Sequence, residues 1–187
     1  MAGVVALVTH PEMAAKGRSL SLGENGQVTE RAWRKALPRM LDKGSLTHLD
    51  LQGNSIGDEG AKAVAAAVAA SGSLTHLDIC DNNIGVEGAK AIAEVVAASG
   101  SLTRLSLRLN KIGDEGAKAI AGAVAASGSL TELWLANNNI GDEGAKALAA
   151  GISASGSLAL KKLVVPDGLE RHAELKAACE WKGVELK

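Results

Sequence analysis

The side chains with the greatest capacity for chemistry are two histidines and a group of acids that recur at one spacing. His48 and His76 are 28 residues apart, each is followed two residues later by an aspartate, and Cys80 and Asp81 stand close behind the second. Imidazole, thiolate and carboxylate groups are ligands for zinc. Matching side chains on neighbouring parallel strands, however, leave the sheet in one direction about 4.8 Å apart, which does not close a tetrahedron of ligands. We therefore predict no metal site and interpret these side chains as a solvated, mildly acidic patch.

Other catalytic patterns are missing from the sequence. Serines stand in Ser-Gly pairs at expected helix ends, with no histidine and acid in a triad arrangement. Many of the 22 glycines follow a repeat period, and none forms part of a phosphate loop of the G-x-x-x-x-G-K type. We expect no catalytic residues, no enzyme activity and no cofactor.

A repeat must position these residues. The segment L-T-H-L-D-L-Q-G-N-S-I begins at Leu46 and returns, with changes, at Leu74, Leu102 and Leu130, a period of 28 residues without a slip. The pattern L-x-x-L-x-L-x-x-N-x-I resembles the leucine-rich-repeat signature, and the long unit is similar to the ribonuclease-inhibitor type, whose repeat carries a full helix. The resemblance implies a right-handed α/β solenoid, with parallel strands on the concave face and helices on the convex face.

The flanks of the repeat array differ from it. We interpret residues 1–18 as an N-terminal extension, and 19–44 as a degenerate first repeat that caps the array. A helix is expected over 30–41, with Trp33 as a lid on the first core face.

Four regular repeats occupy 45–156, and 157–187 are interpreted as a C-terminal cap. There the strand restarts two residues late, a helix follows from about Glu170 to Trp181, and Cys179 and Trp181 are expected to be lid residues.

Each regular unit is expected to alternate buried and outward side chains along its strand. In the first unit Leu49 and Leu51 point inward and the residues between them point out. Asp58, Asp114 and Asp142 stand where they could cap the helix of their own unit. Val86 takes this place in the second unit, which predicts a cap weaker by about 1 kcal/mol there.

One asparagine recurs at the turn of every unit. In the family that the repeat resembles, this amide lies inside the turn and bonds main-chain groups of adjacent repeats, which have no sheet partner of their own. We assign these residues a structural role and no chemistry. They are Asn54, Asn82, Asn110 and Asn138.

The outward positions differ between units, whereas helix and turn positions are nearly copied. Solvent-facing positions can drift, but tryptophan and arginine are the residue types most enriched at binding hot spots. We therefore predict a protein or peptide partner on the concave face. The predicted partner-binding residues are His48, Asp50, His76, Asp78, Asp81, Arg104, Arg108, Glu132 and Trp134.

Composition narrows the partners further. A net charge of −1 gives no electrostatic reason to expect nucleic acid or a membrane surface. Two cysteines in unlike segments form no disulfide framework, and the apolar run 3–8 is too short for a signal peptide or a membrane span. We expect a cytoplasmic protein, either a monomer or a subunit of a complex.

Two alternatives remain open from the sequence alone. The repeat also resembles that of Ran-activating proteins, which regulate a small GTPase through an acidic segment and a loop asparagine that this chain does not clearly match. An architectural subunit, held through its alanine-rich convex face, is the other alternative.

Overall fold

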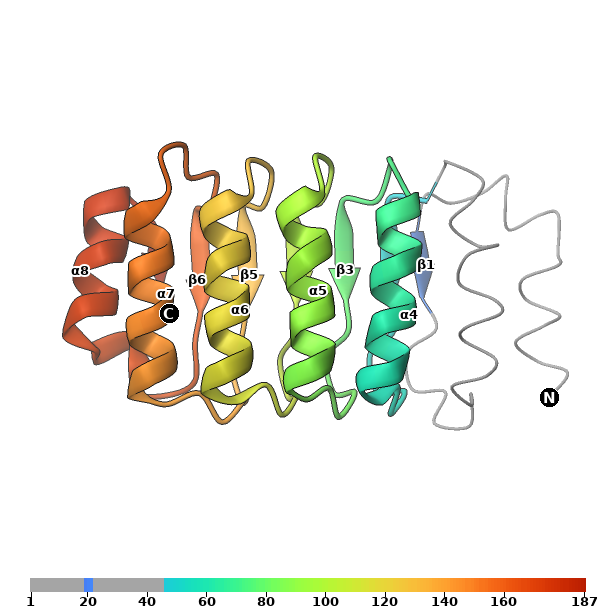
Figure 1. Cartoon of the computed structure of the whole chain (residues 1–187), viewed down its shortest axis with the longest axis horizontal. Helices are drawn as coiled ribbons and strands as arrows, with labels where there is room; N and C mark the ends of the chain where they lie inside the picture. Colours follow the sequence, from blue (N-terminus) through green and yellow to red (C-terminus); the bar gives the residue numbers. More distant parts are fainter. Residues whose placement is uncertain (1–18, 22–45) are drawn as a thin grey trace, which may run out of the picture.

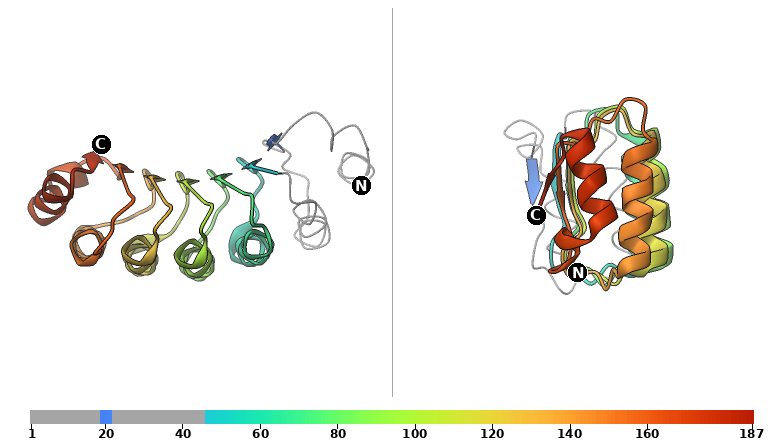
Figure 2. Two further views of the ribbon diagram at one scale, coloured as in Figure 1. Left: turned by 90° about the horizontal axis from the view of Figure 1, so that it is seen from above. Right: turned by 90° about the vertical axis from the view of Figure 1, so that its left-hand side faces the viewer.

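A computed structural model, which describes residues 19–21 and 46–187, shows a row of strand–helix units (Figure 1). Within the described residues, seven parallel strands form one sheet in the order of the sequence. Figure 2 shows from above that the strands line the inner side of a shallow arc and the helices its outer side. The expected extension over 1–18, the expected helix over 30–41 and Trp33 lie outside the described residues.

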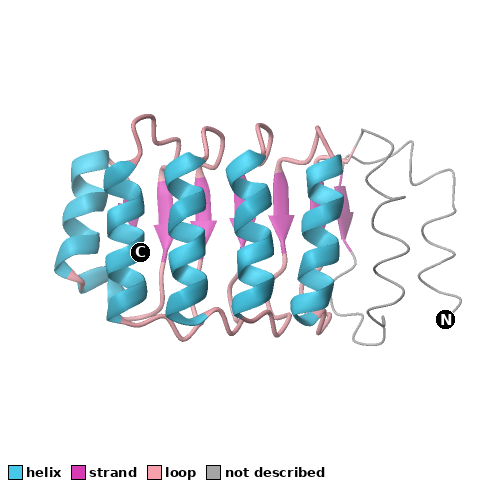
Figure 3. Ribbon diagram, in the orientation of Figure 1, coloured by secondary structure: helices cyan, strands magenta, loops and turns pink. Residues whose placement is uncertain are grey.

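Strands are short and helices take up about half of each unit (Figure 3). The strands are β1 Ser19–Ser21, β2 His48–Asp50, β3 His76–Asp78, β4 Arg104–Ser106, β5 Glu132–Trp134, β6 Lys162–Val164 and β7 Glu185–Leu186. The helices are α4 Gly57–Ala70, α5 Val86–Ala98, α6 Gly113–Ala126, α7 Asp142–Ala154, the 3-10 helix η1 Leu169–Arg171 and α8 Ala173–Lys182. No helix in the described part of the chain is long and apolar enough to cross a bilayer.

The strand register follows the leucines. Leu49, Leu77, Leu105 and Leu133 lie side by side on β2 to β5, so the period of 28 residues is also the sheet register. Leu133 then pairs with Leu163 rather than with Lys161, which is the two-residue delay expected from the sequence. The division of the chain into extension, repeats and cap stays a prediction.

The core is aliphatic because the sequence has no Phe or Tyr. The aligned strand leucines are buried, and each adds about 2 kcal/mol through burial. Each of the helices α4 to α7 has a fully buried alanine in its first turns, and in α4, α5 and α6 this alanine lies against a glycine in the first turn of the next helix. Side chains that small let neighbouring helices pack closely. The alanines are Ala61, Ala89, Ala117 and Ala145.

The turn asparagines join one unit to the next. The amide Nδ2 of Asn110 donates to the carbonyls of Ile79, Leu107 and Arg108 at 2.9–3.0 Å. Its Oδ1 accepts from the backbone N–H groups of Asn82, at 3.1 Å, and Ile84, at 2.9 Å. One buried side chain therefore satisfies five main-chain groups in two units.

The equivalent asparagine of the next unit, Asn138, makes fewer hydrogen bonds. Its Nδ2 donates to the carbonyls of Leu107, Leu135 and Ala136. Its Oδ1 is buried and accepts no hydrogen bond from the described residues.

The helix caps differ from the expectation. Asp58 does not cap α4; its Oδ1 accepts from the N–H groups of Gly85, at 2.6 Å, and Gly88, at 2.9 Å, at the start of α5 in the next unit. Asp114 caps α7 in the same way, through Gly141 and Gly144. The prediction of caps within a unit is wrong because α4 begins at Gly57 and α6 at Gly113, so Asp58 and Asp114 lie inside the first turn of their own helix and not before it.

It follows that α6 lacks this cap, and α4, whose upstream position lies outside the described residues, has no side-chain cap either. Val86 occupies the upstream place and has no acceptor, and α6 has no side-chain cap. The weaker helix cap, which was predicted for the second unit, therefore falls on α6 in the third unit.

The segment 157–187 ends the described sheet differently from the repeats. Helix α8 ends at Gly183, whose φ of +69° suits glycine, and β7 pairs in parallel with β6. Cys179 is buried, and burial raises the pKa of its thiol to about 11. Trp181 is 70% exposed, so the prediction that it is a lid residue is wrong. It lies on the outward side of α8, with Lys182 Nζ 4.3 Å from its ring centroid.

Candidate functional site: the concave sheet face

The sheet register aligns the outward side chains into rows that run across the units. One row is His48, His76, Arg104, Glu132 and Lys162. The next row along the strands is Asp50, Asp78, Ser106, Trp134 and Val164. Seven of the nine predicted partner-binding residues lie on β2 to β5 and leave the same side of the sheet, and Asp81 and Arg108 stand in the loops that follow β3 and β4.

The two histidines stack on each other. Their ring centroids are 3.9 Å apart and the rings are inclined by 20°. Thr75 Oγ1 donates its only hydrogen to the carbonyl of Thr47, at 2.9 Å, so it accepts from His76 Nδ1, 2.7 Å away. In neutral His76 the lone pair is therefore on Nε2. Burial, then His48 and Arg104, lower the pKa of His76, so its ring is neutral at pH 7.

The acids beyond the histidines bond their own strand ends. Asp50 accepts from the backbone N–H of Gln52, at 3.0 Å, and from Ser21 Oγ, at 2.8 Å. Asp78 accepts from the N–H of Cys80 at 2.9 Å. Burial raises the pKa of Asp78, and burial also raises the pKa of the Cys80 thiol. Neither acid is therefore a freely mobile surface group.

These groups do not form a metal cluster. Within 19–21 and 46–187, no three or more His, Cys, Asp or Glu side chains come together in a way that could hold an ion. The stacked rings explain part of this, because nearly parallel rings direct their ring nitrogens side by side rather than toward one point.

The centre of the concave face is basic, and part of its positive charge is neutralised by an ion pair within the protein. Arg104 is bound to Glu132 on the next strand, with Nη2 2.6 Å and Nε 2.9 Å from Oε1. Trp134 is half-buried rather than exposed, between Ser106 and Val164 in register, with Lys162 Nζ 5.9 Å from its ring centroid. It therefore offers a partner less apolar surface than an outward tryptophan could.

The loop after β4 holds two residues outside the predicted set. Leu109 is 47% exposed and has a φ of +55°, and Lys111 is exposed beyond it. A signal was present in the sequence, because the places equivalent to Leu109 hold Gly53, Asp81 and Asn137. A leucine among residues that suit a left-handed turn is the odd member.

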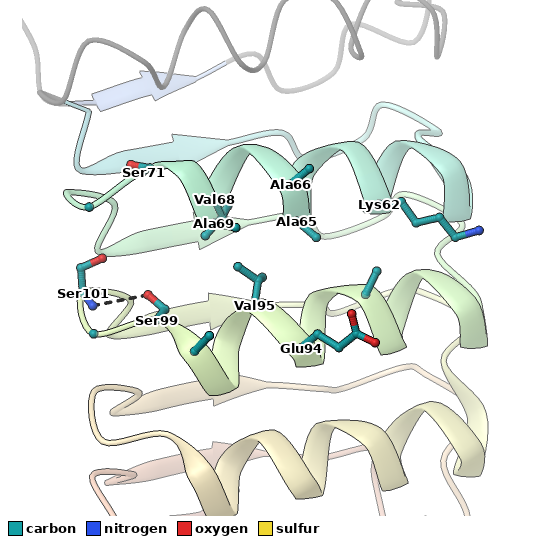
Figure 4. Close-up of a pocket in the computed structure, with 14 residues that line it drawn as sticks. Lys62, Ala65, Ala66, Val68, Ala69, Ser71, Glu94, Val95, Ser99 and Ser101 are labelled. Carbon is teal, nitrogen blue, oxygen red and sulfur yellow. Dashed lines mark hydrogen bonds between the residues drawn. The ribbon is translucent and has the colours of Figure 1, made fainter.

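The convex face has a groove between α4 and α5 of about 760 Å³ (Figure 4). Its lining residues are mostly the small residues alanine, serine and glycine, and Lys62 and Glu94 are the charged ones. Figure 4 shows Val95 pointing from α5 toward α4. At the equivalent place in α7 is Gly151, where a β-carbon would clash with the backbone carbonyl of Ala121 in α6. The side chain between two helices thus decides how closely they pack.

A family model described as "Leucine Rich repeat" matches the chain four times, over 45–65, 71–93, 99–121 and 127–149. These matches fall on the four units that carry β2 to β5 and helices α4 to α7. The chain is a leucine-rich-repeat protein, and its fold is the α/β solenoid of that class. No curated protein sequence matches it.

Solved structures with a similar fold include the following two. The C-terminal domain of tropomodulin from Caenorhabditis elegans has a TM-score of 0.61 at 16% identity, over 83% of this chain and 93% of that one. Actin-binding site 2 of leiomodin-1 has the same TM-score and identity, over 74% of this chain and 80% of that one. At this identity the likeness concerns the fold.

Proposed function

We propose that the chain is a protein-recognition module that binds a protein or peptide partner across its concave sheet face. The observation that carries the proposal is where the units differ. Buried leucines, turn asparagines and helix alanines are copied, whereas the outward rows change from histidine and aspartate to arginine, glutamate and tryptophan. Repeat solenoids use their concave surface for recognition, and a surface specific to one partner has to be non-repeating.

The comparisons support a protein as the ligand. The leiomodin-1 domain with this fold is an actin-binding site, so the fold presents a surface to a protein partner in that case. A further part of the proposal is that the repeat is of the ribonuclease-inhibitor type, because helices α4 to α7 have 13 or 14 residues.

The proposal also includes a reducing compartment such as the cytoplasm. Cys80 and Cys179 are both free and buried, in separate parts of the fold. A single oxidised pair between them would require the core to open.

The experiment starts by capturing partners with the intact chain from its source lysate and identifying them by mass spectrometry. Binding of the purified partner is then measured for Trp134→Ala, which we expect to weaken it by about 2 kcal/mol. A second variant exchanges the ion pair, Arg104→Glu with Glu132→Arg, which keeps the internal pair and reverses the charges offered to the partner. We expect at least about tenfold weaker binding from it.

Lys62→Ala on the convex face is the control, since its side chain lies on the opposite side of the solenoid and pairs only locally with Glu59. Circular dichroism checks that every variant is folded. Full binding by both concave variants would contradict the proposal.

An architectural role through the convex face is a second candidate, favoured by the groove between α4 and α5. Ala66→Glu places a charge on an exposed wall of that groove. Loss of the partner in this variant, with the concave variants unaffected, would establish the architectural role instead.

A further inference from the structure

The loop 108–111, which follows β4, has a backbone conformation that its sequence does not favour. The turn requires a left-handed residue in every unit, with φ of +69° at Gly53, +53° at Asp81 and +57° at Asn137. Glycine, aspartate and asparagine accept this conformation, whereas a bulky apolar residue rarely does. Leu109 adopts it with φ of +55°. The fold would be better served by any of the other three residues.

The core does not explain the leucine either. Leu109 is 47% exposed and, with Trp181, is one of the two large apolar side chains that stand out in the described residues as exposed. A residue that strains the backbone and does not enter the core is expected where a binding surface needs it.

Two cations flank this leucine, and one of them, Arg108, acts on the acid Asp78 without forming an ion pair. Burial raises the pKa of Asp78, and Arg108 opposes that rise. The side chains of Arg108 and Lys111 are exposed, and neither forms a hydrogen bond or ion pair with another described residue. Other cations of the repeats are paired: Arg104 with Glu132, and the four helix lysines with a glutamate three residues earlier. The loop therefore offers positive charge that no ion pair within the described residues neutralises.

The neighbouring unit limits where an anion can bind. Asp81 takes the place of Leu109 one unit earlier, and Asp78 and Asp50 lie on the same face of the sheet. An extended polyanion that crosses several units would meet these carboxylates. A short acidic segment that contacts the third unit alone would not, so the charge pattern favours a protein segment over a nucleic-acid backbone.

We propose that the loop 108–111 is the centre of the interface and binds an acidic segment of the partner in which a bulky apolar side chain stands between carboxylates. Leu109 contacts the apolar side chain, and Arg108 and Lys111 pair with the carboxylates on either side. This inference rests on the proposed recognition function, moves its centre from the sheet to the loop, and names the chemistry of the partner.

The test uses the full chain and short labelled peptides that carry Asp or Glu on both sides of a central Leu, Phe or Trp. Comparison peptides carry Ser at the centre, or Lys in place of the acids, and a single-stranded oligonucleotide is measured beside them. Fluorescence polarisation at low salt gives the affinities. We expect the acidic peptides with an apolar centre to bind most tightly, and Ser at the centre to weaken binding at least about tenfold.

Leu109→Asn is the decisive variant because Asn137 already occupies this place in the next unit with nearly the same φ. The variant relieves the backbone, so its melting temperature should equal or exceed that of the unchanged chain. Its affinity for the acidic peptides should nevertheless fall at least about tenfold. Arg108→Glu with Lys111→Glu should turn the preference toward the lysine peptides.

Three results would overturn the inference: no binding of any acidic peptide to the unchanged chain, equal affinity for Leu109→Asn, or tighter binding of the oligonucleotide. Failure of the recognition function is a separate result. If the captured partner is lost in the Arg104/Glu132 exchange but kept in Leu109→Asn, the concave face binds and the loop does not.

Discussion

The octapeptide I-G-D-E-G-A-K-A occurs at Ile56, Ile112 and Ile140; α4 and α6 start alike, whereas α7 starts differently. Gly113 has φ of +62° and its N–H donates forward to the carbonyl of Asn138 at 2.9 Å. Gly141 is extended, with φ of −110°, and its N–H donates to Asp114 at 2.7 Å. Helix α6 begins at Gly113 and helix α7 begins one residue later in its repeat, at Asp142.

The cause of the difference is the unit upstream. Asp114 precedes α7, whereas Val86 precedes α6 and provides no carboxylate. Without an acceptor behind it, the glycine N–H turns toward the next unit, which requires a positive φ. The local conformation of a repeat is thus decided by a residue 28 positions earlier, and the same eight residues have two structures.

The largest loss of stability is expected from the turn asparagine, a residue that precedes both α6 and α7. Asn110→Ala takes the hydrogen-bond partner from the carbonyl of Ile79 and from the N–H groups of Asn82 and Ile84, and should lower the free energy of unfolding by about 2–3 kcal/mol. Asn138→Ala should cost less, because its Oδ1 accepts no bond from the described residues. Urea denaturation followed by circular dichroism measures both. An equal loss for the two variants would show that the Oδ1 contacts contribute nothing.

Removal of the upstream carboxylate should have the next largest effect. Asp114→Ala takes the acceptor from two N–H groups of α7 and should destabilise by about 1–2 kcal/mol. Asp142→Ala is matched in repeat position, is exposed and caps no described helix, so it should stay within about 0.5 kcal/mol. Similar values for the two variants in urea denaturation would argue against caps between units.

The glycines at the two starts should respond differently to the same substitution. Gly113→Ala forces a β-carbon into a left-handed residue and should cost about 1 kcal/mol. Gly141→Ala should be close to neutral, since an extended residue accepts alanine and a β-carbon there has only ordinary contacts. The melting temperatures of the two variants test this prediction. A larger loss for Gly141→Ala than for Gly113→Ala would show that the left-handed glycine precedes α7 and not α6.

The smallest expected effect is a gain in stability. Val86→Asp supplies α6 with the missing carboxylate and should stabilise by about 0.5–1 kcal/mol, because the existing bond to Asn138 is given up in exchange. It should also make Gly113→Ala harmless. A double-mutant cycle measures this coupling, and additivity of the two changes would refute it.

Strands and register could be predicted from the sequence because leucines at period two fix which side is buried and the 28-residue period fixes the partner strand. The delay at Leu163 followed from the same reasoning. The helix caps could not be predicted in this way. Equivalent positions in neighbouring units look the same in the sequence, and only the packing of the units shows that Asp58 accepts the N–H of Gly85 in the next unit.

The candidate site was predictable in outline only. The row that contains Arg104 and Glu132 is visible in the sequence, but their ion pair was not inferred from it, and it changes which cation is free to bind. The half-burial of Trp134 depends on Lys162 and Val164, which follow the break in register. Trp181 was expected to face the core because a large apolar residue near a chain end often does, and the short helix α8 instead buries Leu175 and Cys179.

The residues between the helices have a consequence for the radius of the solenoid. Hydrogen bonds fix the strands at about 4.8 Å, so the inner circumference is the same for every unit. The outer circumference depends on Val95, Ala123 and Gly151, which occupy one place in successive helices and decrease in size. One convex residue per unit can therefore change the curvature of the solenoid. The concave surface then becomes more open or more closed around a partner, although every residue on that surface stays the same.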